Sequence, residues 1–287
     1  VDPYIEPGKP SSGLLPGIDP DSRYEPGSAD HRVQAYNFRL CMTRDPSIRR
    51  PFVKPEGYDP LDYELLARAL ASGWREVFGK FDPIRGGKVD VNNHGPVSSD
   101  FIGQNHAWPE ADHAERERLF QAHASWQAGW LWFLAEDPSV PAEIRERVRA
   151  WGPCRDEFPD TDGWSPQLYV RESRRLRGEL VMTERHCRGE APVPDPVGMG
   201  SYAMDSHHCR RFVRDGRVMN EGDVQVGVPP YGISYRAILP PRGACENLLV
   251  PVCVSASHIA YGSIRMEPVF MILAQSAALA ADRALER

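Results

Sequence analysis

The stretch from Tyr202 to His208 contains side chains that could transfer a proton. Tyr202, Asp205, His207 and His208 supply a phenol, a carboxylate and two imidazoles. Hydride removal from an alcohol or amine carbon requires a nearby base for the O–H or N–H proton, and an imidazole, which titrates near pH ~6.5, suits that work. The alternative is structural, because successive histidines on a strand point to opposite sides, one to solvent and one to the core. A zinc site with the neighbouring cysteines is not expected, since no recognised ligand spacing is present.

A second polar cluster surrounds Gly95. Its members are Asn92, Asn93, His94, Ser98 and Asp100. Such a loop can grip a hydroxyl-rich substrate, or it can satisfy its own backbone through Asx turns, and both readings stay open.

A charged run between Arg171 and Arg175 offers a clamp for a carboxylate. Alternation along an extended segment puts these two arginines on one face, where either guanidinium could bind a carboxylate. Charged runs of this kind also occur on faces exposed to solvent or to a partner. Both interpretations, the carboxylate clamp and the exposed face, therefore stay open.

The segment from Glu246 to Glu286 predicts a buried strand, a loop of small residues and then a helix opened by Glu267 and Pro268. Proline suits the first turn of a helix, where its missing N–H costs nothing. The free N–H groups of that turn would face the loop and favour an anionic ligand such as a nucleotide cofactor. The competing interpretation is a buried terminal helix whose apolar residues only pack.

This C-terminal segment resembles the cofactor-closing segment of FAD-dependent oxidoreductases of the glutathione-reductase-like flavoprotein superfamily. The similarity runs from Asn247 to Ala281 and includes the Ser-Ile-Arg-x-Glu-Pro signature of one branch. Further matches occur in the same order along nearly the whole chain: Gln34–Thr43, Asn92–Gly103, Pro109–Asp112, Pro166–Arg175, and Gly198–Tyr202 with Asp205 and His207.

The resemblance implies FAD as the cofactor and hydride transfer from a small polar substrate. It makes His207 or His258 the base, with Tyr202 and Asp205 nearby, and Arg171 the residue that orients the substrate. The cofactor-binding residues that it implies are Cys253, Ser255, Ser257, Ser263, Ile264, Arg265, Glu267, Pro268 and Gln275. The candidates for substrate binding are Asn92, Asn93, His94 and Ser98. No residue is assigned to a metal.

In related flavoproteins the start of the terminal helix points toward the flavin, where it stabilises negative charge on the reduced ring. Arg265 would add a full positive charge there, and Glu267 would anchor that arginine or a ribityl hydroxyl.

One part of the family pattern is missing. Such flavoproteins start with a strand and a Gly-x-Gly-x-x-Gly turn that approaches the pyrophosphate. The only formal match begins at Gly198, follows a proline-rich stretch and precedes a polar run, so we interpret it as a chance match. The chain begins at Val1, without an initiator methionine. We therefore expect an N-terminal dinucleotide-binding half, present as a separate chain or a cleaved fragment, to be the partner.

Two departures from the family pattern keep another function class open. Pro251 and Val252 stand where relatives have Gly-Arg, and Ala274 and Ala278 stand where they have glycine. The alternative is a non-catalytic flavoprotein remnant that acts as an assembly or binding subunit.

Composition is typical of a folded domain. The chain has 287 residues, a hydrophobic fraction of 41% and a net charge of -6. A negative net charge gives no reason to expect nucleic acid, and no apolar run approaches the roughly 20 residues that span a bilayer, so we expect no membrane partner. The cysteines are too scattered to predict a disulfide framework, and the N-terminus leaves the compartment unassigned.

The pattern of elements predicts an α+β fold, which becomes α/β overall when the N-terminal half completes it. Helices are expected at about 59–73, 112–135 and 141–151. Strands are expected at 34–43 and two or three times within 218–238, and the 167–184 region is expected to contain a strand or a strand-helix junction. We expect an extended segment and strand at 1–45, a mainly helical cap at 46–190, a β-rich substrate region at 191–245, and the closing strand and helix of a Rossmann-like FAD domain at 246–287.

Overall fold

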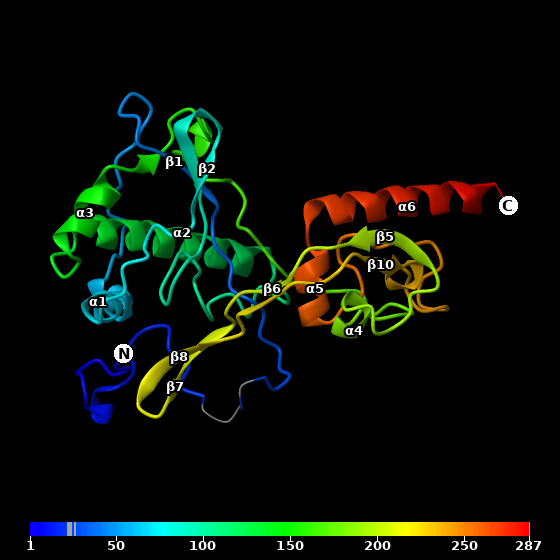
Figure 1. Ribbon diagram of the computed structural model, residues 1–287, viewed down its shortest axis with the longest axis horizontal. Coiled ribbons are helices and arrows are strands. Elements are labelled where there is room, and N and C mark those ends of the chain that lie inside the picture. The colour runs from blue at the N-terminus through cyan, green and yellow to red at the C-terminus, as the bar shows by residue number, and fades with distance from the viewer. Residues whose placement is uncertain (22–24, 26, 287) are drawn as a thin grey trace. The chain divides into compact units, whose positions relative to one another are not determined.

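The computed structural model describes residues 1–21, 25 and 27–286. The chain forms two compact units, each built from two stretches of sequence (Figure 1). Unit 1 comprises Val1–Val170 and His208–Glu221, and unit 2 comprises Arg171–His207 and Gly222–Arg287.

The helices of unit 1 confirm the sequence prediction. They are α1 (Glu64–Ala71), α2 (His113–Glu136) and α3 (Ala142–Arg149), and a 3-10 turn at Pro60–Tyr63 leads into α1. Local capping sets where α2 begins, because the Asp112 carboxylate accepts a hydrogen bond from the Glu115 N–H at 2.8 Å. These boundaries were predictable because the groups that define them lie within one turn of each other.

The sheet of unit 1 is antiparallel, with the strand order β2-β3-β1-β4. Its strands are β1 (Leu40–Thr43), β2 (Phe81–Ile84), β3 (Lys88–Val91) and β4 (Gly152–Pro153). The predicted strand at 34–43 is therefore too long. The amide side chain of Gln127 accepts from the Phe38 N–H at 2.8 Å and donates to the Phe38 carbonyl at 2.9 Å. Before β1 begins, the buried Gln127 side chain of α2 therefore makes the hydrogen bonds that a neighbouring strand would otherwise make.

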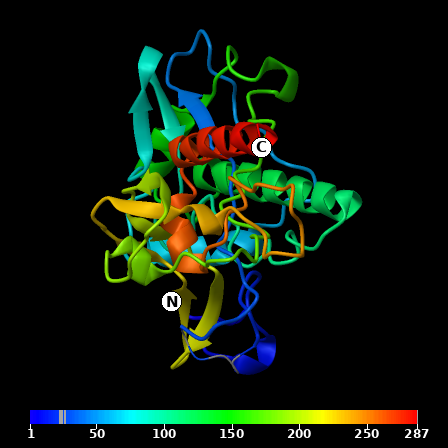
Figure 2. The same cartoon turned by 90° about the vertical axis from the view of Figure 1, so that its right-hand side faces the viewer.

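A hairpin of β7 (Arg210–Arg214) and β8 (Arg217–Glu221) lies beside the N-terminal segment (Figure 2). Two backbone hydrogen bonds join them, from Val218 N to the Val1 carbonyl at 3.1 Å and from Asp19 N to the Arg211 carbonyl at 2.7 Å. The N-terminal segment contains one 3-10 turn, Pro10–Ser12. Its proline and glycine residues permit this irregular path over the hairpin.

The core of unit 1 is aromatic. Tyr63 stacks on Trp126 and on Phe133, with ring centroids 5.0 and 5.6 Å apart. Gly129 of α2 makes this packing possible, because a Cβ at that position would lie 2.0 Å from the Tyr63 hydroxyl. Trp126, Trp130 and Phe133 of α2 therefore belong to the core.

Unit 2 combines short helices, two antiparallel strand pairs and one long helix. Its elements are α4 (Glu184–Cys187), β5 (Pro196–Gly200), β6 (Met204–Ser206), β9 (Val224–Val226), β10 (Tyr231–Ser234), α5 (His258–Ile264) and α6 (Glu267–Leu285). Strand β5 pairs with β10, and β6 pairs with β9. Together with β8, strands β9 and β10 confirm the prediction of two or three strands within 218–238. Gly198 and Gly200 lie in β5, so the formal glycine motif does not form a strand-turn-helix phosphate loop.

Three sequence predictions, for the segments 247–254, 255–263 and 167–184, are wrong. No strand forms between Asn247 and Val254, because its backbone bonds to several segments in turn: Val250 N donates to the Ile238 carbonyl, and the Cys253 carbonyl accepts from Leu176 N. The expected small-residue loop is instead largely helix α5, which Ser257 caps by accepting from the Ala260 N–H at 3.3 Å. The 167–184 region also forms no strand; it contributes only isolated bridges. The fold is mixed α+β.

Candidate active site

A chain of three side chains in unit 2 links Glu172, His258 and Ser206. The His258 Nδ1 lies 2.7 Å from Glu172 Oε1, and the Ser206 Oγ lies 2.8 Å from His258 Nε2. The Glu172 side chain is 0% exposed and that of His258 is 30% exposed. Arg175 donates to the other Glu172 oxygen at 2.7 Å. The carboxylate is thus held between a guanidinium and an imidazole.

This chain of contacts satisfies His258 in both protonation states. A carboxylate only accepts hydrogen bonds, so Nδ1 carries the proton that faces Glu172. Neutral His258 accepts at Nε2 from the Ser206 hydroxyl. Protonated His258 donates at Nε2, and the hydroxyl then turns to the His207 carbonyl, which lies 3.3 Å away. The site can therefore gain or lose a proton without leaving a buried polar group unpaired.

Asp205 organises a second set of contacts beside the first. Its carboxylate accepts from Arg265 at 3.0 Å, from Gln225 at 2.9 Å and from the Tyr202 hydroxyl at 3.3 Å. The His207 Nε2 lies 4.0 Å from the same carboxylate. Helix α5 approaches closely here, because a Cβ on Gly262 would lie 2.8 Å from the Asp205 carbonyl oxygen.

A buried hydrogen-bond chain supports the loop that holds Tyr202. The Tyr231 hydroxyl donates to Ser263 Oγ at 2.7 Å, and Ser263 in turn donates to the Tyr202 carbonyl at 2.5 Å. Burial raises the pKa of Tyr231. The phenol therefore acts here as a neutral donor that fixes the backbone.

Four of the five predicted catalytic residues gather in these contacts: Tyr202, Asp205, His207 and His258. Arg171 is buried in the same unit and precedes Glu172. Sequence reasoning missed Glu172 as a partner of His258, and it missed Ser206 and Gln225. The only sequence signal was position, since Ser206 lies between Asp205 and His207 and Glu172 lies inside the charged run.

Comparison with protein families gives one result, a match to the family described as FAD dependent oxidoreductase over residues 6–287. The chain belongs to this family. Comparisons with curated proteins and with solved structures return no match. Membership of this family supports the interpretation of the chain as an oxidoreductase that uses FAD, which the sequence resemblance had implied.

The cofactor residues expected of this oxidoreductase divide into two groups. Ser255, Ile264, Ser263 and Arg265 are buried, and all but Ile264 have side-chain partners inside unit 2. Ser257 caps α5. The remaining members are exposed: Cys253, Glu267, Pro268 and Gln275. In this oxidoreductase the buried group shapes the α5–α6 corner, and only the exposed group is accessible to a ligand.

The start of α6 fits one edge of a flavin site. The helix begins at Glu267 with Pro268 in its first turn, and no side chain caps it with a hydrogen bond. Its positive end is therefore open to an electron-rich group. The rest of a dinucleotide would require other backbone, since neither glycine of β5 forms a phosphate cradle.

The outer face of α6 is apolar and uncovered. Met271 is 70% exposed and Leu279 is 61% exposed, while Val269, Leu273 and Ala277 face the core of unit 2. A groove of about 1030 Å³ runs along the helix between Ala281 and the segment that contains Leu248. By length and composition α6 is also apolar enough to cross a membrane, which the sequence analysis did not anticipate.

The expected substrate-binding residues lie in unit 1, where each has a local role. His94 pairs with Glu76 at 2.9 Å, and Asn92 accepts from the Asn93 N–H at 2.8 Å. Buried Ser98 accepts from the Asp100 N–H at 3.3 Å. Among residues 1–21, 25 and 27–286, no group of three or more His, Cys, Asp or Glu side chains could hold a metal ion.

Proposed function

We propose that this chain is the C-terminal portion of an FAD-dependent oxidoreductase that removes a hydride from a small polar substrate, with His258 as the base. The observation that carries the proposal is the Glu172–His258–Ser206 chain. The bound flavin would accept the hydride. The chain's own residues would take up the proton that leaves the substrate O–H or N–H.

His258 suits this role better than His207. Both of its ring nitrogens have partners, and its side chain is partly exposed. His207 is buried, and its Nε2 lies 4.0 Å from Asp205. The Ser206 hydroxyl would turn to the His207 carbonyl, which leaves His258 Nε2 to take up the substrate proton. Glu172 would hold the ring and balance the charge that forms.

The substrate would lie near the exposed part of His258. Arg171 follows Val170 directly and is buried in unit 2, which suits a guanidinium that orients a substrate inside a closed site. The open positive end of α6 would stabilise negative charge on the reduced flavin.

An N-terminal dinucleotide-binding half would complete the site by packing on α6. One observation supports that partner: the outer face of α6 exposes Met271 and Leu279. Burying such side chains stabilises an interface by roughly 25 cal/mol for each Å² removed from water.

The test is purification of the tagged chain from its native cells, followed by a visible spectrum and intact-mass analysis. We expect an oxidised-flavin spectrum and a second polypeptide. A colourless preparation that contains no other polypeptide and does not bind added FAD would overturn the catalytic proposal. A colourless preparation with a partner would instead favour the non-catalytic assembly subunit.

A further inference from the structure

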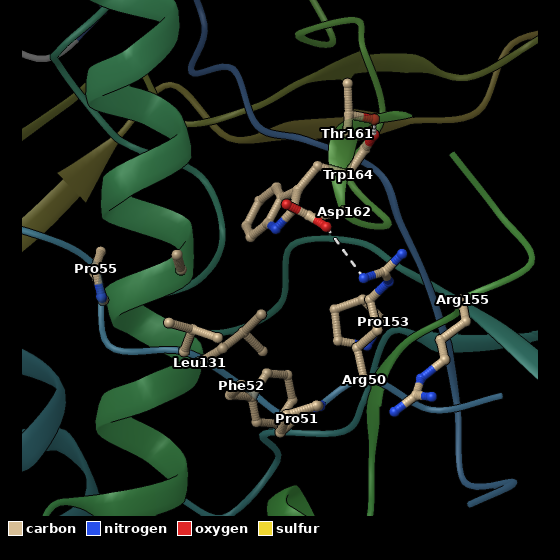
Figure 3. Close-up of a pocket in the computed structure, with 12 residues that line it drawn as sticks. Arg50, Pro51, Phe52, Pro55, Leu131, Pro153, Arg155, Thr161, Asp162 and Trp164 are labelled. Carbon is tan, nitrogen blue, oxygen red and sulfur yellow. Dashed lines mark hydrogen bonds and ion pairs between the residues drawn. The ribbon is translucent and has the colours of Figure 1, made fainter. Parts of the chain in front are cut away.

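A pocket of about 810 Å³ opens in unit 1 (Figure 3). Arg50, Phe52, Leu131, Arg155, Asp162 and Trp164 are among the residues that line it. Its volume lies within the range of roughly 300–1,000 Å³ that is usual for small-molecule sites. We call it the arginine pocket.

Strand pairing places both arginines on one wall of the arginine pocket. The segment after β1 continues antiparallel to the segment after β4: Arg50 N donates to the Pro153 carbonyl at 2.8 Å, and Arg155 N donates to the Ile48 carbonyl at 2.7 Å. Arg50 therefore lies opposite Pro153. Alternate residues of an extended strand share a face, so Arg155 lies on the same side as Pro153 and Arg50.

This wall carries an excess of positive charge. Arg50 Nη1 bonds to Asp162 Oδ1 at 3.1 Å, but that carboxylate belongs to a side chain that is 89% exposed. The Arg50 Nε is buried and has no hydrogen-bond partner among the described residues. None of the ion pairs in the described part of the chain includes Arg155. Two guanidinium groups thus face one solvated carboxylate.

The remaining walls are apolar. Leu131 of α2 and Phe52 lie together on one side of the pocket, and the Trp164 ring lies across from them (Figure 3). An inorganic anion would leave these apolar walls in contact with water, and a neutral hydrocarbon would leave the guanidinium donors unused. A ligand with an anionic head and an apolar body satisfies both.

We propose that the arginine pocket binds an organic carboxylate that has an aromatic or branched apolar body. The carboxylate pairs with Arg155 and with the donors that Arg50 does not give to Asp162. The body of the ligand packs between Trp164 and the Phe52–Leu131 side. This assignment does not depend on flavin chemistry, because every residue that it uses belongs to unit 1.

The test is calorimetric or ligand-observed NMR titration of the purified full chain. The probes are 4-phenylbutanoate, indole-3-acetate and 4-methylpentanoate, and the comparison compounds are 4-phenylbutanamide and inorganic phosphate. We expect at least one carboxylate to bind, 4-phenylbutanamide to bind about tenfold more weakly than its acid, and phosphate not to compete. A tenfold loss corresponds to about 1.4 kcal/mol, which is close to the lower end of the range for one charge-assisted hydrogen bond.

Two variants locate the binding site. Arg155→Gln is expected to weaken carboxylate binding about tenfold, and Arg85→Gln, an exposed arginine elsewhere in unit 1, is expected to leave it unchanged. Arg155 is exposed, so its variant should fold, which circular dichroism checks. Failure of all three carboxylates to bind at millimolar concentration overturns the proposal. Equal binding of acid and amide, or an unchanged affinity in Arg155→Gln, overturns it as well.

Discussion

The Nδ1 of His258 lies 2.7 Å from the Oε1 of Glu172, and that carboxylate is completely buried. The contact joins the first residue of α5 to a segment without regular structure. Because Arg175 occupies the second carboxylate oxygen, Glu172 can hold the imidazole in only one orientation.

The first prediction concerns the stability of this contact. Glu172→Gln removes a buried charge that lies between the Arg175 guanidinium and the His258 imidazole, and breaking a fully buried pair costs roughly 3–5 kcal/mol. Here we expect the free energy of unfolding to fall by about 2 kcal/mol, because His258 and Arg175 keep partial access to water. Urea unfolding and hydrogen exchange of the α5 amides measure the loss. Glu179→Gln is the matched control and should change stability by less than about 0.5 kcal/mol, since its pairing with exposed Arg242 spans 4.0 Å.

The second prediction separates the two candidate bases. In the holoprotein, His258→Gln should lower the rate of flavin reduction by about 10²–10⁴-fold, the usual contribution of a general base. Ser206→Ala should also slow flavin reduction, by a smaller factor, because the hydroxyl that orients the His258 ring is lost. His207→Gln should change the rate less than about threefold. Single-turnover absorbance of the flavin measures each rate, and the reverse ranking of the two histidine variants would reassign the base to His207.

The third prediction concerns the partner that covers α6. Leu279→Glu puts a charge into the apolar outer face, so we expect the N-terminal half to be lost from the purified complex. The fold should persist, because Leu279 is 61% exposed. Arg283→Gln, also exposed on α6, is the control and should keep the partner. If the complex survives Leu279→Glu, the assigned surface is wrong, and flotation of the wild-type chain with lipid vesicles would point to a membrane instead.

The fourth prediction concerns the aromatic core of unit 1. Gly129→Ala should destabilise the protein, because overpacking costs about 1–3 kcal/mol and the gain in helix propensity is only about 1 kcal/mol. The new methyl group would meet the Tyr63 hydroxyl, which donates to the Trp126 carbonyl at 2.9 Å. Tyr63→Phe removes the obstructing oxygen, so the double variant should lose less stability than the two single variants added together. Additive losses in thermal unfolding would contradict this.

A control for the glycine test lies in unit 2. A Cβ added to Gly227 has no heavy atom within 4 Å, and its backbone does not require a positive φ. Gly227→Ala should therefore leave stability within about 0.5 kcal/mol of the wild type.

The fifth prediction is a pH dependence in unit 1. Burial, together with Arg32, lowers the pKa of His106 below its ordinary value of 6.5. The Val33 N–H also donates to the His106 Nδ1 at 3.4 Å, a contact that needs this nitrogen unprotonated. The unfolded chain then binds a proton at higher pH than the folded protein does. Stability is complete above pH ~6.5 and falls as the pH drops through the folded pKa.

The measurement compares hydrogen exchange of the α2 amides at about pH 7.5 and pH 5.5. His106→Asn keeps an acceptor in place of Nδ1 but cannot titrate, so its loss of protection at low pH should be smaller than that of the wild type. Confining the readout to unit 1 matters, since burial also lowers the pKa of His186 in unit 2. An equal pH dependence in both proteins would refute the assignment, and exposed His113→Asn should behave like the wild type.

Where the sequence predictions failed, a distant partner had replaced the expected one. Phe38 belongs to a convincing strand pattern, but Gln127 satisfies its backbone from a helix. The expected strand before Val254 forms no ladder, because Ile238 and Leu176 bond to it one after another. Long-range contacts of this kind produce no periodic pattern of residues in the local sequence, so the sequence does not predict them.

The sequence alone determined the three helices of unit 1, the three strands within 218–238 and the membership of an FAD-dependent family. Those features depend on residue spacing, on caps such as Asp112 and on motif order, all of which can be read within a short window. Only the tertiary structure decided that Glu172 meets His258, that Arg50 and Arg155 share a wall, and that one face of α6 stays uncovered. Each of these depends on which distant segments bury one another, because the free energy of burial depends on final contacts and not on sequence separation.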